Sequence, residues 1–269
     1  MAKAAKARPE SGYNRIVAKI FHDRYTVDCS EIDFVRQDLL DARDAVAPEL
    51  KRLNAGDVNY RYRFRGSLPS SITNTEPSGK EWIIIGAGRS KYRFLLVPQT
   101  RIVPNPNLKT IDIPDNTPEI IRMYKLDDEQ ALLAVLRYNR LLDIFLGLTT
   151  YSLQNHLRTF VKTIGQIEID ELYIGIDKSG CHYVIPVQAK GGSDQIGVAQ
   201  TMQDIAYAEG KFPEMRYRAV SAQFMSDGIV ALFDLTVENL QVKVIEERHY
   251  RLMPAASISD KAVRDYRLT

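Results

Sequence analysis

The sequence predicts an α+β protein with two domains: a smaller basic domain over residues 1–110, and a larger domain over residues 111–269 in which helices flank a mixed sheet. Two observations support this prediction. Segments with helical spacing of apolar residues and segments with strand-like patterns follow one another along the chain. A segment rich in Pro, Asn and Asp, about residues 102–118, separates the two halves and is the best candidate for a linker.

The composition is that of an ordinary globular protein, with 269 residues, 45% hydrophobic residues and 26% charged residues. No apolar run approaches the length of a membrane span, and the opening MAKAAKARPE lacks the apolar core of a signal peptide. Two cysteines, Cys29 and Cys181, are too few for a disulfide framework or a zinc site. We therefore expect a soluble cytoplasmic protein that does not associate with a membrane.

The first half is predicted to hold two helices followed by basic strands. Residues 13–21 form the first helix; residues 30–46 form the second, with Ser30 as its N-cap and apolar residues at helical spacing. Residues 59–69 alternate between aromatic and basic side chains, which predicts a strand. Residues 81–98 predict a hairpin around a glycine-rich turn at 86–90. This order is typical of a winged-helix-like or similar small DNA-binding module.

The second half is predicted to alternate between helices and strands. A long helix starts near Asp127 or Asp128 and is interrupted near Gly147, and Asp227-Gly228 marks the turn of a hairpin. The predicted elements are helices at 128–146, 151–162 and 193–210, with Ser193 or Asp194 as the last N-cap, two strands within 165–190, and further strands within 215–237 and 241–254.

Charge is distributed unevenly along the chain. Residues 51–109 contain eleven Lys or Arg against three Asp or Glu, although the net charge of the whole protein is only +2. A basic segment beside an acidic remainder suggests a polyanion-binding surface next to a metal-binding region. The alternative is that these Lys and Arg side chains only solvate a surface.

Two pairs of polar residues mark a candidate catalytic site. Residues two apart in a strand point the same way, so Glu168 and Asp170 share one face of a strand, and Gln188 and Lys190 share one face of the next. The alternate residues of that strand (Ile185, Val187 and Ala189) take the opposite face and are expected to pack on a helix. If the two polar faces coincide, carboxylates, an amide oxygen and an ammonium meet at one place.

This set of groups suits hydrolysis of a phosphate ester. Oxygen ligands bind hard divalent cations such as Mg²⁺, which polarise a phosphate and lower the pKa of a bound water. Lys190 beside such a cation can orient or deprotonate the water and offset negative charge in the transition state. The following Gly191-Gly192 lets a backbone approach closely without a Cβ.

The pattern Asp170, then Gln188-x-Lys190 on the next strand, then a helix resembles the PD-(D/E)xK nuclease superfamily and its type II restriction endonucleases. The resemblance covers about residues 125–235. It implies a restriction-endonuclease-like mixed sheet, one or two Mg²⁺ ions held by Asp170, Gln188 and Glu168, and catalysis by these residues with Lys190. It also implies a homodimer, because both strands of a palindromic site must be cut.

One position departs from the pattern of that superfamily. Gln188 stands where an acid is usual, and a neutral amide is a poorer metal ligand than a carboxylate. Glu168 is placed to supply the missing charge, whereas Glu171 lies on the opposite face. No acid is evident on the preceding helix, where Gln154 is the nearest candidate. His156 is expected on the polar face of that helix and not as a ligand.

Candidate DNA contacts fall into three groups. The turn within GAGRSKY lacks the spacing of a phosphate-binding loop for nucleotides, so no nucleotide cofactor is expected, and its basic residues are assigned to DNA. The candidates are Arg89, Lys91 and Arg93 at this turn, Arg61, Arg63 and Arg65 on the preceding strand, and Ser193 and Gln195 after the catalytic lysine.

Three functions remain compatible with the sequence. The first is a Mg²⁺-dependent type II restriction endonuclease that cuts double-stranded DNA at a specific site. The second is a structure-selective nuclease of DNA repair or recombination. The third is a DNA-binding regulator with an inactive nuclease core, which the neutral Gln188 motivates.

Overall fold

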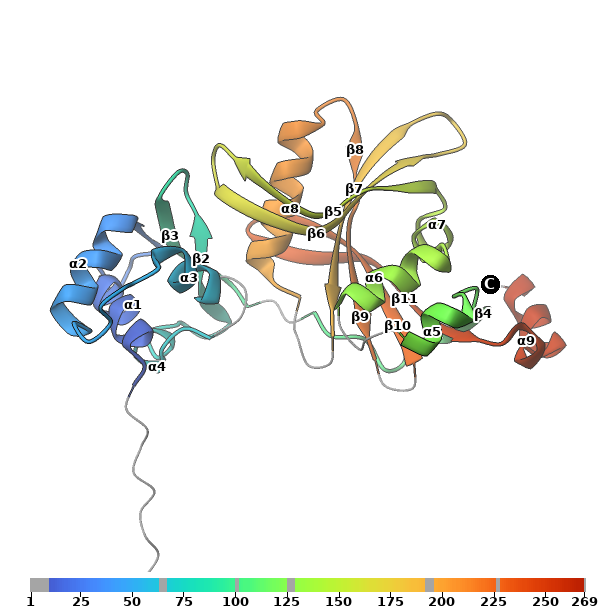
Figure 1. Ribbon diagram of the computed structural model, residues 1–269, viewed down its shortest axis with the longest axis horizontal. Helices are drawn as coiled ribbons and strands as arrows, with labels where there is room; N and C mark the ends of the chain where they lie inside the picture. The colour runs from blue at the N-terminus through green and yellow to red at the C-terminus, as the bar shows by residue number, and fades with distance from the viewer. Residues whose placement is uncertain are drawn as a thin grey trace, which may run out of the picture. The chain divides into compact units, whose positions relative to one another are not determined.

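The computed structural model describes residues 10–62, 67–99, 102–124, 129–191, 196–225 and 228–268 (Figure 1). The chain divides into two compact units. The first comprises Met1–Gln99 together with the short segment Phe160–Gln166, and the second comprises Thr100–Thr159 and Ile167–Thr269. Among the described residues, no helix is long and apolar enough to cross a membrane.

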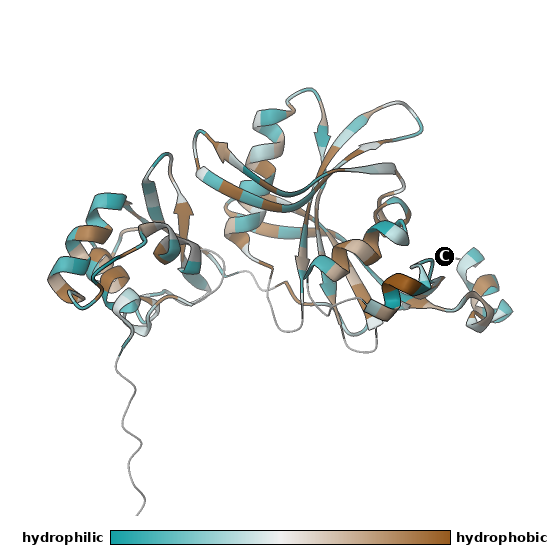
Figure 2. Cartoon of the chain, in the orientation of Figure 1, coloured by the Kyte–Doolittle hydropathy of each residue, from teal (hydrophilic) through white to brown (hydrophobic). Residues whose placement is uncertain are grey.

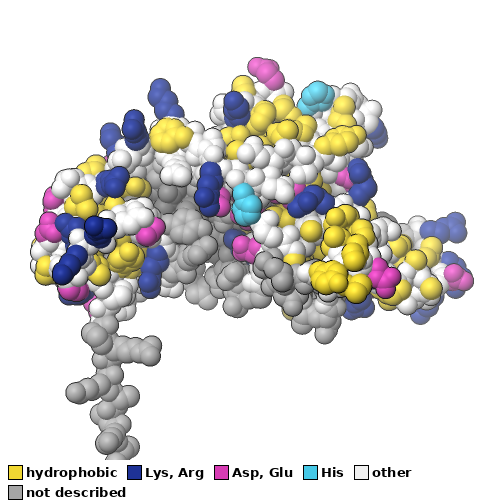
Figure 3. Space-filling model, in the orientation of Figure 1, with side chains coloured by type: hydrophobic (Ala, Val, Ile, Leu, Met, Phe, Trp, Pro, Cys, Tyr) yellow, Lys and Arg dark blue, Asp and Glu magenta, His cyan; other side chains and the backbone are white. Residues whose placement is uncertain are grey.

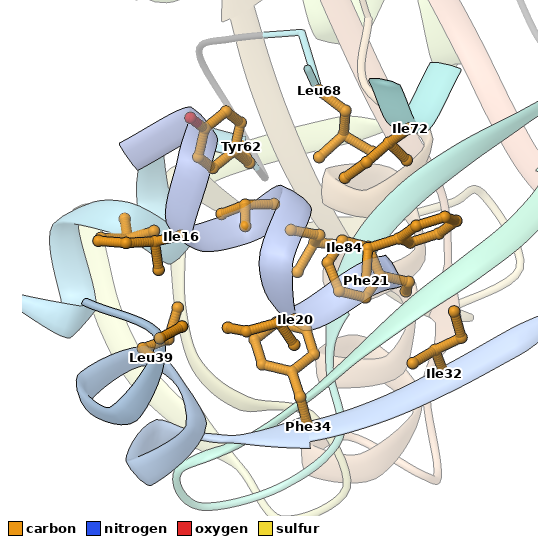
Figure 4. Packing of buried hydrophobic residues seen from close by; sticks show 14 of the residues in the cluster. Ile16, Ile20, Phe21, Ile32, Phe34, Leu39, Tyr62, Leu68, Ile72 and Ile84 are labelled. Atoms are coloured by element: carbon orange, nitrogen blue, oxygen red, sulfur yellow. The ribbon is translucent and has the colours of Figure 1, made fainter. Parts of the chain in front are cut away.

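The first unit packs its helices around a three-stranded antiparallel sheet with the order β1-β3-β2. Its core is rich in aromatic residues: the ring of Phe21 lies edge-on to those of Trp82 and Phe94, at centroid distances of 5.1 Å and 5.3 Å. Figure 4 shows Ile20 and Phe21 of the first helix packed near Ile32 and Phe34 of the first strand. The elements are α1 (Gly12–His22), β1 (Glu31–Val35), α2 (Arg36–Val46), α3 (Ala55–Tyr60), α4 (Ser70–Thr73), β2 (Lys80–Gly86) and β3 (Lys91–Pro98).

The predicted helix over residues 30–46 is wrong in its first third. Residues 31–35 form β1, in which Ile32 and Phe34 are buried and their neighbours are exposed, and this strand pairs with β3. The helix begins only at Arg36, and the Asp38 carboxylate accepts a hydrogen bond of 2.7 Å from the backbone N–H of Val35. Pairing with a strand sixty residues away therefore overrides the helical spacing.

The predicted strand over residues 59–69 is also wrong where the structure describes it. The Asn54 side chain caps α3, and helical backbone continues through Arg61 and Tyr62. Tyr62 is buried, and its hydroxyl donates a 2.6 Å hydrogen bond to Asn14 of α1, whereas Arg61 is exposed. The aromatic alternation thus comes from one ring turned into the core and not from a pleated strand. Arg63 and Arg65 lie outside the described residues.

The second unit is built on an eight-stranded mixed sheet, which confirms the predicted mixed sheet flanked by helices. Its order is β4-β11-β10-β9-β7-β6-β5, with β8 beside β7. β7 runs parallel to β9 and antiparallel to β6, and β4 runs parallel to β11. The strands are β4 (Thr110–Pro114), β5 (Thr149–Val161), β6 (Gly165–Ile176), β7 (His182–Lys190), β8 (Arg216–Tyr217), β9 (Ala219–Phe224), β10 (Ile229–Glu238) and β11 (Gln241–Met253).

Helices cover both faces of this sheet (Figures 1 and 2). Leucines of α6 and α7 pack on Ile185, Val187 and Ala189 of β7, as the strand pattern predicts. The alternate residues of β7 face α8, the helix on the opposite side. The helices are α5 (Glu119–Tyr124), α6 (Glu129–Tyr138), α7 (Leu141–Leu146), α8 (Val198–Lys211) and α9 (Asp260–Asp265), with short 3₁₀ turns η3 (Ala255–Ser257) and η4 (Tyr266–Leu268).

Two predictions for the second half are corrected by strand pairing. The segment 102–118 is not only a linker, because Thr110–Pro114 forms β4 beside β11. The helix predicted over residues 151–162 is the long strand β5 at the end of the sheet. Leu153 and Phe160, which suggested an apolar helix face, are each more than half exposed, so no buried stripe exists there. The N-caps proposed at Asp127, Asp128, Ser193 and Asp194 lie outside the described residues.

Candidate active site

The candidate site lies where β6, β7 and α8 meet in the second unit. The Asp170 carboxylate on β6 accepts a 3.0 Å hydrogen bond from the backbone N–H of Ala189 on β7, which places it between Gln188 and Lys190. The Gln188 side-chain amide is buried and donates a 2.6 Å hydrogen bond to Asp204 on α8. The two polar strand faces therefore do coincide, and a second carboxylate from the helix joins them.

The neighbouring strand β9 extends this polar group. In the parallel register of β7 and β9, Gln188 lies beside Ser221 and Lys190 lies beside Gln223. Ser221 and Gln223 are both buried among apolar neighbours of the sheet. Strands β7 and β9 therefore present apolar side chains on the face that α6 covers and polar side chains on the face that α8 covers.

Several oxygen atoms of this group are buried without a hydrogen-bond partner among the described residues. They are Oε1 of Gln188, Oδ1 of Asp204 and Oγ of Ser221. Burying a polar atom without a partner is costly, so each such atom in a native structure needs an explanation. These three atoms lie on β7, α8 and β9, and oxygen atoms are the ligands that hard divalent cations prefer.

The electrostatics of the two aspartates favour a cation. Burial raises the pKa of Asp204 well above its usual range, and the nearby Asp170 charge adds to the rise, while the hydrogen bond from Gln188 and the charge of Lys190 oppose it. Burial also raises the pKa of Asp170, against the Ala189 N–H and Lys190. Both carboxylates therefore hold protons more tightly than free ones, unless a positive charge replaces the protons.

Lys190 is mostly buried, with its side chain 14% exposed. Its Nζ lies 3.7 Å from a carboxylate oxygen of Glu129 at the start of α6. The same ammonium is close enough to lower the pKa of both Asp170 and Asp204. Its ion-pair partner is thus Glu129, while its charge also acts on the two aspartates.

Glu168 shares the face of Asp170 but is held by two side chains of β5. Its carboxylate lies 3.3 Å from Nε of Arg158 and 3.7 Å from Nδ1 of His156. Both residues lie on a strand and not on the helix predicted to precede the site, and the same correction applies to Gln154. Glu171 takes the opposite face as expected, where it is buried and pairs with Arg137 of α6 at 3.0 Å.

Asp204 was not identified from the sequence, although a signal for it exists. The α8 residues Thr201, Asp204, Ile205 and Ala208 recur at helical spacing and are all buried. A carboxylate inside an otherwise buried helical stripe requires a partner, which here is Gln188. Gln200 and Gln203 on the same helix are also buried.

The predicted DNA-binding residues differ in exposure and in whether an acidic side chain already pairs with them. Arg89 and Lys91 are exposed at the turn between β2 and β3. Arg93 lies 2.6 Å from carboxylate oxygens of both Glu31 and Asp33, so its charge is compensated within the unit. On the visible face, basic and acidic side chains are interspersed (Figure 3). Of the other candidates, Arg61 is exposed, and Ser193 and Gln195, like Arg63 and Arg65, lie outside the described residues.

Over the part of the chain that the structure describes, no group of three or more His, Cys, Asp or Glu side chains is arranged to hold a metal ion. The set described above instead combines two carboxylates with amide and hydroxyl oxygens. Comparison of the chain with protein-family models, curated proteins and solved structures gave no match.

Proposed function

We propose that this protein is a Mg²⁺-dependent endonuclease that hydrolyses phosphodiester bonds of double-stranded DNA at specific sites. The observation that carries the proposal is the group of buried oxygens around Gln188, Asp204 and Ser221, which adjoins Asp170 and Lys190. Two carboxylates with raised pKa values beside one lysine form an arrangement expected at a catalytic site.

The cation would be held by Asp170, Asp204 and Oε1 of Gln188. Unpartnered buried acceptors on α8 and β7 fit such an ion, since it would satisfy them. When bound, Mg²⁺ supplies polarisation of the phosphate and a bound water of lowered pKa. Glu168 is not assigned as a ligand of the cation, because its carboxylate is paired with Arg158 and His156.

Lys190 would act on the phosphate and the attacking water. In the reaction the water oxygen forms a bond to phosphorus, and the bond to the leaving oxygen of the DNA backbone breaks. Negative charge increases on the nonbridging oxygens as this occurs, and an ammonium at this position offsets that charge. The order Asp170 on one strand, Gln188 and Lys190 on the next, then helix α8 agrees with the PD-(D/E)xK pattern and supports a restriction-type nuclease. Such an enzyme would act as a homodimer, because both strands of a palindromic site must be cut.

Digestion of a large phage DNA tests this proposal. Wild-type protein with Mg²⁺ is expected to give discrete fragments, whereas EDTA or Asp170→Asn abolishes them. Asp177→Asn is the matched control: Asp177 is a partly exposed acid in the turn after β6, and asparagine keeps the Oδ1 acceptor for the backbone N–H groups of Ser179 and Cys181, so this variant should cut normally. Fragments in EDTA, or unchanged cutting by Asp170→Asn, would contradict the assignment; cleavage of branched DNA alone would favour the structure-selective nuclease.

A second candidate is a DNA-binding regulator without catalytic activity. The specific observation in its favour is the neutral Gln188, which leaves two buried carboxylates where three acids are more usual at a metal site. This function predicts a gel shift of duplex DNA, with no cleavage at any protein concentration in Mg²⁺ or Mn²⁺.

A further inference from the structure

We propose that Arg158 and His156 on β5 bind a phosphate of the DNA strand next to the active site, and that Glu168 holds the two side chains in position before DNA arrives. This inference rests on the proposed function, because it concerns the substrate of the same site. It assigns a role to β5, whose residues the sequence predicts to be helical.

Both side chains are accessible and close to the catalytic group. Arg158 is 69% exposed and His156 is 55% exposed, while Glu168 between them is 27% exposed. Glu168 lies two residues before Asp170 on the same face of β6, and the charges of Glu168 and His156 both act on Asp170. An anion bound by Arg158 and His156 would therefore lie within electrostatic range of Asp170.

The backbone of His156 is unusual for a strand residue. Its φ is +47°, in the left-handed region that non-glycine residues rarely adopt. Such a conformation in a strand redirects the side chain, and strained residues of this kind are found preferentially at functional sites. β5 is the last strand on its side of the sheet, so a nucleic-acid backbone can approach it.

A DNA phosphate could replace the Glu168 carboxylate as the partner of Arg158 and His156. Arg158 presents a planar fork that matches phosphate oxygens, and an exposed ion pair contributes little stability. Arg158 and His156 share one carboxylate, so a phosphate can take its place without leaving a buried charge. Glu168 thus keeps the two side chains ordered while the site is empty of DNA.

The test is the salt dependence of binding to a fluorescein-labelled duplex, measured by fluorescence anisotropy with Ca²⁺ in place of Mg²⁺ so that binding is separated from cutting. Each lost phosphate contact lowers the slope of log Kd against log salt concentration by about 0.9. We expect that decrease for Arg158→Ala, a decrease for His156→Ala, and restoration of the slope by Arg158→Lys, with weaker affinity because the fork is lost.

Arg248→Ala is the matched control. Arg248 is also an exposed arginine on a strand, 54% exposed and 2.9 Å from Glu246, but β11 is separated from β5 by four strands. Its slope should equal that of the wild type, and all variants should share one unfolding midpoint.

Equal slopes for Arg158→Ala and Arg248→Ala would overturn the inference even if the wild type cuts DNA. A slope that falls only for the β5 variants would support it even if the wild type does not cut, which separates its failure from failure of the nuclease proposal. A wild-type protein that does not bind duplex DNA would overturn both.

Discussion

Replacing Asp204 by asparagine should raise stability without a cation and reduce the stabilisation that Mg²⁺ provides. The substitution keeps the size of the side chain and an acceptor for the Gln188 amide, but removes a buried negative charge. Without a cation the wild type must bury that carboxyl near Asp170, with one oxygen unpartnered. We therefore expect Asp204→Asn to be more stable than the wild type in EDTA and less responsive to Mg²⁺.

The magnitude follows from the ligand set. A cation at about 100 times its Kd stabilises the wild type by about 2.7 kcal/mol. Loss of a residue that hydrogen-bonds to a metal ligand weakens metal binding about 10–100-fold, and loss of one of the two carboxylate ligands should cost at least as much. The stabilisation then falls to about 0.4–1.4 kcal/mol. In EDTA, the substitution removes the cost of burying the Asp204 charge, so the variant is expected to gain stability at pH values where that carboxyl is ionised in the unfolded state.

The pH dependence has a defined sign. Because burial raises the pKa of Asp204, the folded state binds more protons than the unfolded state between the ordinary carboxyl pKa and the raised one. The contribution of Asp204 to the stability of the cation-free wild type is thus fully present at low pH and is lost as pH rises through that window. Asp170 acts in the same direction. The stability difference between wild type and Asp204→Asn should widen as pH rises above the ordinary carboxyl pKa and through the raised pKa of Asp204.

Thermal unfolding by circular dichroism in EDTA and in Mg²⁺ measures both effects. A stabilisation of about 2.7 kcal/mol corresponds to about 5–10 °C in Tm for a chain of this size. Asp234→Asn is the control: Asp234 is equally buried in the same unit but pairs with Arg218, so its loss should lower Tm and leave the Mg²⁺ shift intact. If Asp204→Asn lowers Tm in EDTA and keeps the full Mg²⁺ shift, the proposed cation site is wrong.

Three further predictions concern other parts of the molecule. Lys190→Met should lower the rate of DNA cleavage by about 100-fold or more with duplex affinity nearly unchanged, and a normal rate would exclude its catalytic role. Phe21→Ala should destabilise the first unit by about 3–5 kcal/mol in urea, followed by the fluorescence of Trp82, its edge-on neighbour; a loss below about 1 kcal/mol would contradict the packing. Lys91→Ala should weaken DNA binding more than Arg93→Ala, because two carboxylates already compensate Arg93, and the reverse order would refute this.

Elements with local signals could be predicted from the sequence. The hairpin of β2 and β3 has a glycine-rich turn, and the hairpin of β9 and β10 contains Gly228 with φ of +69°, so both were found. β1, β4 and β5 were missed, because their strand character comes from distant partners. β4 pairs with β11, almost 140 residues later, and β5 exposes side chains on both faces, which removes the alternation that identifies a strand.

The sequence predicts those parts of the candidate site that lie on one strand, because residues two apart in a strand point to the same face. The two-residue spacing placed Gln188 with Lys190, and their proximity to Asp170 followed once β6 and β7 were read as neighbours. Asp204 required knowledge of how α8 is rotated about its axis over the sheet. That rotation is set by packing of Ile205 and Ala208, which the spacing of apolar residues suggests but does not connect to a particular strand.

The position of Asp204 also explains why a neutral residue at position 188 is compatible with a metal site. A carboxylate there would lie against the carboxylate of Asp204, since the present side chains are 2.6 Å apart, and two like charges at that distance in a buried place repel strongly. An amide donates a hydrogen bond to Asp204 and still offers Oε1 on its other side. The charge that is missing from β7 is thus carried by α8, and the site keeps two carboxylates beside one ammonium.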